Sequence, residues 1–319
     1  MVHTVLVTGA EGFAGGHLIQ HLRGTGYEVV AGVRNRARKL ALERQSQKAI
    51  VCDITDAINV ARVIASVRPD AVVHLAGIAH PDAAGTDPLL AYQSIVTSWA
   101  NLLDAVRRTV PRAKVVLASA CDVYGPAGAD GRPLREDTSP QPVSTFGSLK
   151  RLAESIAHTF FRDYHLNVTI ARPFNYVGPG QSERSYFAAV ARKLVDWGPG
   201  DGELRLPCLS CRRDLLHVDD VATAYERLVQ DGRPNEIYNI SSGQALTCAE
   251  LVSAMAAEFG LQVPLTESPA VGLPPQLAAL CGDNTKLREE LHWSPTRSAQ
   301  DGLRDLVASY RTAAAAVAR

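Results

Sequence analysis

Three glycines near the start of the chain, Gly9, Gly12 and Gly15, follow one another at intervals of three residues. They lie between an apolar run, residues 3–9, and a helix-compatible run, residues 14–26. Glycine allows a tight turn and a close approach of the backbone to a pyrophosphate, and the start of the next helix offers N–H groups to the same anion. The spacing is not the common G-x-G-x-x-G, but its place between a strand and a helix predicts a bound dinucleotide.

The residue that follows the next predicted strand, residues 28–33, indicates which dinucleotide is favoured. An acidic residue near this place would accept a hydrogen bond from the ribose 2′-hydroxyl of NAD(H). The chain instead has Arg34, with Arg36 two positions later, and guanidinium groups bind a 2′-phosphate that a carboxylate would repel. The sequence therefore favours NADP(H) over NAD(H), the alternative being a basic loop in solvent.

Composition is that of an ordinary globular protein. The 319 residues are 46% hydrophobic and 21% charged, with 33 Lys and Arg against 33 Asp and Glu. This balance excludes a general nucleic-acid or membrane-surface binder. With no run of about 18 apolar residues and no signal-peptide pattern, we expect a cytoplasmic protein.

The pair Cys208 and Cys211 lacks two further ligands nearby, so no metal site is expected.

Strand-like and helix-like runs alternate along most of the chain. This alternation predicts an α/β fold with a doubly wound parallel sheet, which binds ligands at the carboxyl ends of its strands. A strand and a helix are expected within 214–229, the helix capped by Asp219 or Asp220. The other main predicted elements are strands at 48–55, 70–77, 113–120, 167–175 and 236–241 and helices at 89–108, 144–164, 247–259, 284–291 and 301–318.

A series of motifs occurs in one order along the chain. They are TGAEGFAGGHL (8–18), HLAG (74–77), NLLDA (101–105), DVYG (122–125), RPFNYVGPGQ (172–181), RRDLLHVDDVATAY (212–225) and IYNISSG (237–243). In them the chain resembles the extended short-chain dehydrogenase/reductases, a family of nucleotide-sugar epimerases, dehydratases and reductases. Within that family, the motifs at 172–181 and 212–225 look most similar to the reductases of GDP-4-keto-6-deoxymannose and the GDP-mannose 4,6-dehydratases.

The resemblance implies two domains, a nucleotide-linked sugar as substrate and a homodimer. A Rossmann-type NADP-binding domain would comprise residues 1–175 and 214–243, and a smaller, discontinuous substrate-binding domain residues 176–213 and 244–319. The dimer would form through helices at 93–108 and 146–164.

The resemblance also assigns residues to the ligands. At the cofactor it places Gly9, Gly12, Phe13, Ala14 and Gly15 on the pyrophosphate. Arg34 and Arg36 would bind the 2′-phosphate, Asp53 and Ile54 would lie beside adenine, and Lys150 would bind the nicotinamide ribose. Further expected contacts are Leu75, Ala76, Gly77 and Pro173. Asn175 and Arg213 match positions that touch the sugar and the nucleotide phosphates, and His80 is a further polar candidate near the cleft.

The chain departs from the family at its catalytic signature, Y-x-x-x-K on a helix with a Ser or Thr after the fifth strand. Lys150 is present, but Phe146 stands at the tyrosine position and Ala120 at the Ser/Thr position. A positioned acid or base contributes about 10²–10⁴ in rate, so conventional hydride transfer to a ketone is expected to be nearly abolished. A third departure is expected near Leu273, where relatives often carry an arginine.

Three explanations stay open. The chain could be an engineered inactive form, because both replacements delete only a hydroxyl. It could have relocated its acid and base to Asp122 and Cys121, where the family's dehydratases carry theirs; the structural alternatives are a loop-capping carboxylate and a small buried thiol. It could also be a non-catalytic dinucleotide-binding homologue.

Overall fold

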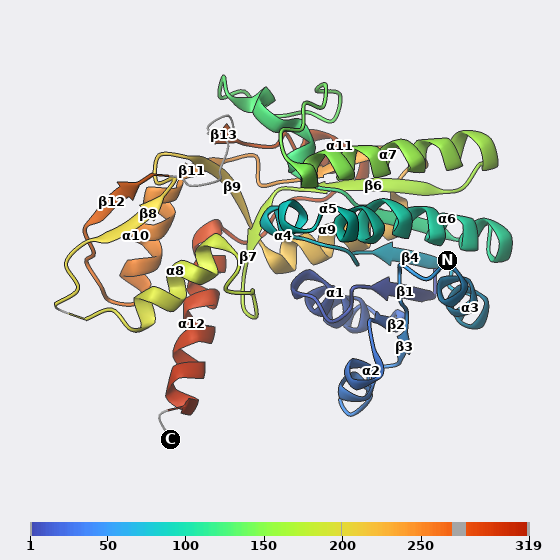
Figure 1. Cartoon of the computed structure of the whole chain (residues 1–319), viewed down its shortest axis with the longest axis horizontal. Coiled ribbons are helices and arrows are strands. Elements are labelled where there is room, and N and C mark those ends of the chain that lie inside the picture. Colours follow the sequence, from blue (N-terminus) through green and yellow to red (C-terminus); the bar gives the residue numbers. More distant parts are fainter. Residues whose placement is uncertain (1, 199, 270–278, 318–319) are drawn as a thin grey trace.

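The alternating strands form one parallel sheet in the computed structural model, which describes residues 2–198, 200–269 and 279–317 (Figure 1). Within these residues seven strands pair in the order β10-β6-β5-β4-β1-β2-β3. Their bounds are β1 (Thr4–Thr8), β2 (Glu28–Val33), β3 (Ala49–Val51), β4 (Ala71–His74), β5 (Lys114–Ala118), β6 (Val168–Pro173) and β10 (Ile237–Ile240). The strand order reverses between β1 and β4, so the ligand crevice is expected at their carboxyl ends.

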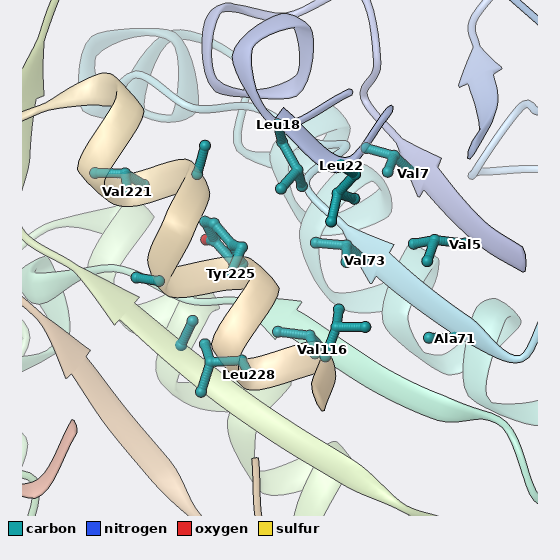
Figure 2. Close-up of a cluster of buried hydrophobic side chains, with 14 of the residues drawn as sticks. Val5, Val7, Leu18, Leu22, Ala71, Val73, Val116, Val221, Tyr225 and Leu228 are labelled. Atoms are coloured by element: carbon teal, nitrogen blue, oxygen red, sulfur yellow. The ribbon is translucent and has the colours of Figure 1, made fainter. Parts of the chain in front are cut away.

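Helices cover both faces of this sheet. On one face, α1 (Phe13–Gly24) and α9 (Val218–Asp231) place Leu22 and Leu228 over Val5 and Val73 (Figure 2). On the other face α3 (Ala57–Val67), α6 (Ser98–Thr109) and α7 (Thr145–Tyr164) pack against Leu6 and its neighbours. Val5 and Leu6 face opposite layers because successive side chains of a strand alternate. Three shorter helices complete these layers: α2 (Arg36–Glu43) contacts β3, whereas α4 (Pro81–Thr86) and α5 (Pro88–Tyr92) contact α7.

A separate apolar cluster fills the other part of the molecule. Phe187, Leu251 and Leu303 are among its buried members. The elements around it are β7 (Asn175–Val177), β8 (Leu204–Pro207), β9 (Arg212–His217), β11 (Ala245–Thr247), β12 (Leu265–Ser268), β13 (Ala279–Leu280), α8 (Tyr186–Val195), α10 (Cys248–Glu258) and α12 (Ala299–Val317). By contrast, α11 (Thr285–Leu291) packs Leu287 into the cluster beneath α9. The division into two domains stays a prediction. No described helix has both the length and the apolar character needed to cross a membrane.

The predicted long helix at 89–108 is interrupted. A π-helical turn, Gln93–Thr97, separates α5 from α6. Ser98 Oγ lies 2.7 Å from the Ser94 carbonyl oxygen and 3.2 Å from that of Ile95, so this hydroxyl donates into the widened turn. Hydrophobic spacing does not reveal one extra residue in a helix, and π-turns occur frequently at functional sites. The predicted position near Leu273 lies outside the described residues.

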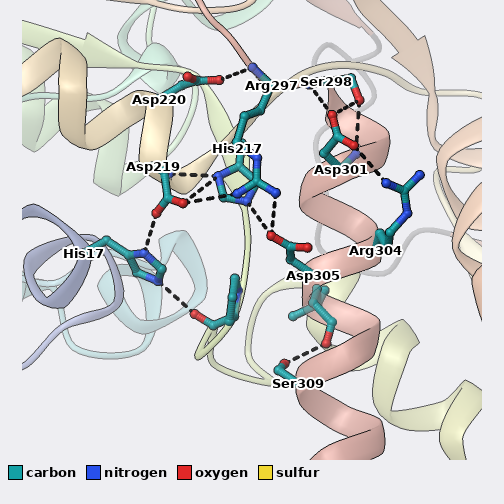
Figure 3. A network of polar contacts seen from close by, with 12 residues as sticks. His17, His217, Asp219, Asp220, Arg297, Ser298, Asp301, Arg304, Asp305 and Ser309 are labelled. Carbon is teal, nitrogen blue, oxygen red and sulfur yellow. Dashed lines mark hydrogen bonds and ion pairs between the residues drawn. The ribbon is translucent and has the colours of Figure 1, made fainter. Parts of the chain in front are cut away.

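The predicted cap of α9 is wrong. The N-cap is His217, whose Nδ1 accepts a hydrogen bond from the Asp219 backbone N–H at 3.0 Å. Asp219 and Asp220 lie in the first helical turn, where carboxylates complement the helix dipole. In Figure 3 the His217 ring lies between Asp219 and Asp305. Histidine is not a common N-cap residue, so the adjacent aspartates were the better sequence candidates.

Candidate active site

The glycine loop connects β1 to α1 at the carboxyl edge of the sheet. Gly9 has a φ of +72°, and a Cβ there would lie 2.7 Å from the Ala76 backbone nitrogen. A Cβ on Gly15 would lie 2.2 Å from the Gly9 carbonyl oxygen. No side chain in the described part of the chain caps the start of α1 at Gly12. The exposed N–H groups at this helix start therefore suit an anion, and the loop fits the pyrophosphate of a dinucleotide.

Phe13 and Ala14 form the first turn of α1. The Phe13 ring stacks on Tyr176, with ring centroids 5.7 Å apart. Because Tyr176 belongs to β7, this contact places the second part of the chain directly against the glycine loop.

The other predicted cofactor residues follow strands of the same sheet. Leu75, Ala76 and Gly77 follow β4, Arg34 and Arg36 follow β2, and Pro173 is the last residue of β6. Asp53 and Ile54 follow β3, where the Asp53 carboxylate accepts a hydrogen bond from the Thr55 hydroxyl at 2.7 Å. Parallel strands end at one edge, so the fold brings all of these residues to the edge that carries the glycine loop.

Lys150 lies on α7 beside the carboxyl end of β5. Its Nζ donates to the Ala118 carbonyl oxygen at 2.6 Å and lies 5.6 Å from the centre of the Phe146 ring and 5.9 Å from that of Trp99. Phe146 and Ala120 are buried in the same apolar cluster. The ammonium group therefore lies beside apolar and aromatic side chains. The resemblance predicts the hydroxyl groups of a tyrosine and a Ser or Thr at this place.

Cys121 and Asp122 open a 3-10 helical segment, Cys121–Gly128, which begins three residues after the end of β5. Cys121 Sγ lies 3.9 Å from Asp122 Oδ2. Burial raises the pKa of both groups, and the positive charges of Arg213 and Lys150 oppose this for Asp122. The structure thus places a carboxyl group of raised pKa beside a thiol and under the influence of two cations. A carboxylate of raised basicity can act as a general base, and cations can offset a negative charge that develops on a substrate.

The three predicted substrate residues differ in their surroundings. Asn175 and Arg213 lie on the paired strands β7 and β9, where Asn175 is opposite Leu215 and its Nδ2 donates to the Asp214 carbonyl oxygen at 3.4 Å. His80 precedes α4 and is half-buried, with no hydrogen bond from its ring to another described residue. Its role, like those of the other two, stays a prediction.

Comparison with protein families identifies the family of the chain. The family model described as "NAD dependent epimerase/dehydratase family" matches residues 5–241. The chain belongs to this family. Its members are NAD(P)-dependent nucleotide-sugar epimerases, dehydratases and reductases; the role of the glycine loop in holding the dinucleotide stays a prediction.

Individual relatives span several reactions. The chain is 29% identical to the GDP-6-deoxy-D-mannose reductase of Pseudomonas aeruginosa, over 76% of this chain and 81% of the reductase. It is 29% identical to the dTDP-6-deoxy-L-talose 4-dehydrogenase (NAD(P)(+)) of Kitasatospora kifunensis, over 97% and 96% of the two chains. Among solved structures, RMD from Pseudomonas aeruginosa complexed with NADPH has a TM-score of 0.84 at 25% identity, covering 98% and 99%. The Thermus thermophilus UDP-glucose 4-epimerase complex with NAD has a TM-score of 0.86 at 26% identity, covering 97% and 99%.

Lys150 makes a pH dependence of dinucleotide binding testable. Burial lowers the pKa of its ammonium group to about 8, while Glu154 and Asp122 act in the opposite direction. The charged form therefore predominates below pH 8 and is lost as the pH rises through that value. Since a charge-assisted hydrogen bond to a ribose hydroxyl is stronger than a neutral one, we expect the Kd of NADPH to rise about three- to tenfold between pH 7 and pH 9. Calorimetric titration checks this; a Lys150→Met variant should show weaker binding with no such change, and an equal change in that variant would contradict the assignment.

Two residues that contact predicted site residues were not among the candidates that the sequence indicated. The Trp99 ring, on α6, lies 5.9 Å from Lys150 Nζ, and none of the sequence motifs includes Trp99. Glu11 lies inside the glycine loop and contacts Arg34. A carboxylate within a loop predicted to hold pyrophosphate was a signal that could have been noticed.

Proposed function

We propose that the chain is an NADP(H)-binding enzyme that acts on a nucleotide-linked 4-keto-6-deoxysugar, with GDP as the nucleotide. The similarity to a GDP-6-deoxy-D-mannose reductase and the motifs at 172–181 and 212–225 support this substrate class. Arg34 and Arg36 at the end of β2 support NADP(H). The bound cofactor supplies or accepts a hydride, and the protein supplies orientation and proton transfer.

We assign proton transfer to Asp122, because Phe146 and Ala120 carry no hydroxyl. The observation that carries this proposal is the position of the Asp122 carboxyl group beside Cys121, in the segment that follows β5, where the charges of Lys150 and Arg213 act on it. As a carboxylate, Asp122 takes the proton from the carbon beside the ketone, which leaves an enolate, and then returns a proton to that carbon. The raised pKa makes Asp122 a stronger base, and the two cations offset the enolate charge. Removal and return of this proton are the chemistry of an epimerase. In the alternative 4,6-dehydratase, acting on a sugar that still carries its 6-hydroxyl group, the same enolate would instead expel that hydroxyl group as water, with the Cys121 thiol as a neighbouring acid.

Hydrogen exchange at carbon tests this assignment. Incubated with GDP-4-keto-6-deoxymannose and NADPH in deuterated water, the chain is expected to introduce carbon-bound deuterium faster than a protein-free control. An Asp122→Asn variant should exchange about 10²–10⁴-fold more slowly, because an amide cannot accept the proton. Mass spectrometry after back-exchange of hydroxyl groups into ordinary water measures the label.

The matched control is Asp137→Asn, which removes a carboxylate whose side chain is 76% exposed on the loop after β5. This variant should exchange as fast as the parent chain. Equal exchange rates in the parent and Asp122→Asn proteins would contradict the role of Asp122 and direct attention to Cys121.

The second candidate function is that of a non-catalytic dinucleotide-binding homologue. It is favoured by the close packing of Phe146 and Ala120 in an apolar cluster, which replaces both catalytic hydroxyls with buried hydrocarbon. Tight NADPH binding with no exchange on any nucleotide-linked ketosugar would establish this function in place of the first.

We also propose a homodimer. Leu89, Leu90 and Tyr92 of α5 and Leu152 and Tyr164 of α7 are large apolar side chains left exposed, with Leu89 at 68%. They lie on or next to the predicted pairing helices, α6 and α7, and exposed apolar surface of this kind is typical of an interface. Sedimentation equilibrium measures the mass, and a monomer at micromolar concentration would contradict the dimer. The cytoplasmic location and the separate substrate domain stay predictions.

A further inference from the structure

The end of β2 carries a carboxylate as well as two arginines. Glu11 extends from the glycine loop to this place, where its Oε2 lies 3.4 Å from the Arg34 backbone nitrogen, which donates to it. Glu11 Oε1 lies 3.8 Å from Arg34 Nε. A hydrogen bond of 3.3 Å from the Ala10 backbone N–H to the Gly32 carbonyl oxygen ties the loop to β2. The sequence has no acidic residue directly after β2, but Glu11 of the glycine loop places a carboxylate there.

The two charges are held differently. The Glu11 side chain is 21% exposed, whereas that of Arg34 is 84% exposed. An exposed ion pair of this kind contributes little to stability, because solvent screens it and both side chains lose freedom on pairing. The guanidinium group can therefore leave Glu11 at little cost, while the carboxylate stays beside the Arg34 backbone nitrogen.

These groups prefer different dinucleotides. A carboxylate at the end of β2 accepts a hydrogen bond from the ribose 2′-hydroxyl of NAD(H) and repels a 2′-phosphate. A guanidinium group binds the 2′-phosphate of NADP(H) through paired hydrogen bonds. Arg36 at the start of α2 adds a second cation, and the N-terminal end of that helix also favours an anion.

We infer that Glu11 and Arg34 together determine cofactor choice, so that the chain binds both NAD(H) and NADP(H). Glu11 supports NAD(H) by binding the 2′-hydroxyl, and Arg34 supports NADP(H) when it turns from Glu11 to the 2′-phosphate. Glu11 then limits the preference for NADP(H) that the arginines alone would give. The inference rests on the dinucleotide-binding part of the proposed function and not on the role of Asp122.

The test compares the Kd of NADH and NADPH by isothermal titration calorimetry on the full chain. The parent protein is expected to bind both, with Kd values within about tenfold of each other. In Glu11→Gln, the ratio of the NADH Kd to the NADPH Kd should rise at least tenfold, because the amide neither repels the phosphate nor provides a charged acceptor. In Arg34→Ala, the same ratio should fall at least tenfold.

The charge-matched control is Glu43→Gln, which removes a carboxylate that pairs with Lys39 on α2. It should leave the ratio unchanged. An unchanged ratio in Glu11→Gln, or an equal rise in Glu43→Gln, would overturn the inference while leaving the proposed function in place. A parent chain that binds neither dinucleotide would overturn both, whereas loss of sugar exchange alone would affect only the proposed function.

Discussion

Restoring both missing hydroxyls, by Ala120→Ser together with Phe146→Tyr, is expected to raise the rate of hydride transfer from NADPH to GDP-4-keto-6-deoxymannose by about 10²–10⁴. The new phenol would lie beside Lys150, whose Nζ is 5.6 Å from the centre of the present Phe146 ring. A nearby ammonium group stabilises a phenolate, so it lowers the pKa of the phenol toward the working pH. The new serine would add the hydrogen bond to the reacting carbonyl.

The measurement is loss of NADPH absorbance combined with the mass of the sugar product in deuterated water. Each single variant separates one part of the gain: Phe146→Tyr restores the proton donor and Ala120→Ser only the carbonyl contact. Catalytic groups that act as a unit are not additive, so each single variant is expected to gain much less than the double variant. A double variant that binds NADPH as tightly as the parent chain and still shows no reduction would exclude this substrate.

The result also distinguishes the explanations that the sequence left open. Reduction by the double variant alone, with no exchange by the parent chain, would identify the parent as a disabled reductase. Exchange by the parent chain that disappears in Asp122→Asn would instead identify relocated acid–base chemistry. The two assays follow different atoms, hydride in one and proton in the other, so one result does not determine the other.

Local patterns were sufficient to predict the glycine-containing turn between β1 and α1 and the parallel sheet. Gly9, Gly12 and Gly15 could be interpreted because the strand before them and the helix after them adjoin them in sequence. The strands at 28–33 and 236–241 were found for the same reason: each is a short apolar run with polar or glycine-containing segments on both sides. Their parallel pairing followed from the alternation with helices.

The rest of the site depends on contacts between segments that are distant in sequence. Glu11 meets Arg34 because β1 pairs with β2 in register, and no local pattern gives that distance. Trp99 meets Lys150 because α6 and α7 lie side by side, and the π-helical turn before α6 sets which side chains face α7. The sequence therefore predicted which residues are present at the edge of the sheet, and it could not predict their electrostatic partners.

Replacing Glu154 with glutamine is expected to lower the free energy of unfolding by about 3–5 kcal/mol, because it leaves a buried arginine without its counter-charge. Glu154 is fully buried on α7, one turn after Lys150. Its two carboxylate oxygens accept hydrogen bonds from Arg172 Nε and Nη2, both at 2.8 Å, and Ser119 Oγ donates to it at 2.6 Å. The Arg172 guanidinium group also lies 4.7 Å from the centre of the Tyr124 ring.

Denaturant unfolding measures this loss, and the chain provides a contrast at the same carboxylate. Arg151, whose side chain is 41% exposed, contacts Glu154 at 3.4 Å from the surface side. Arg151→Ala should cost only about 0–1 kcal/mol, because exposed pairs contribute little. Similar losses in both variants would contradict the view that burial makes the pair with Arg172 important.

The Glu154→Gln variant should also change the chemistry of the neighbouring lysine. Burial lowers the pKa of Lys150, and the charge of Glu154 is the largest influence that raises it again. Without that charge the pKa of Lys150 falls below about 8, so the loss of NADPH affinity with rising pH should begin at lower pH than in the parent chain. A variant that is destabilised but keeps the parent's pH midpoint would limit Glu154 to a structural role. A shifted midpoint would show that the buried ion pair between α7 and β6 also sets the protonation of the residue expected to hold the cofactor.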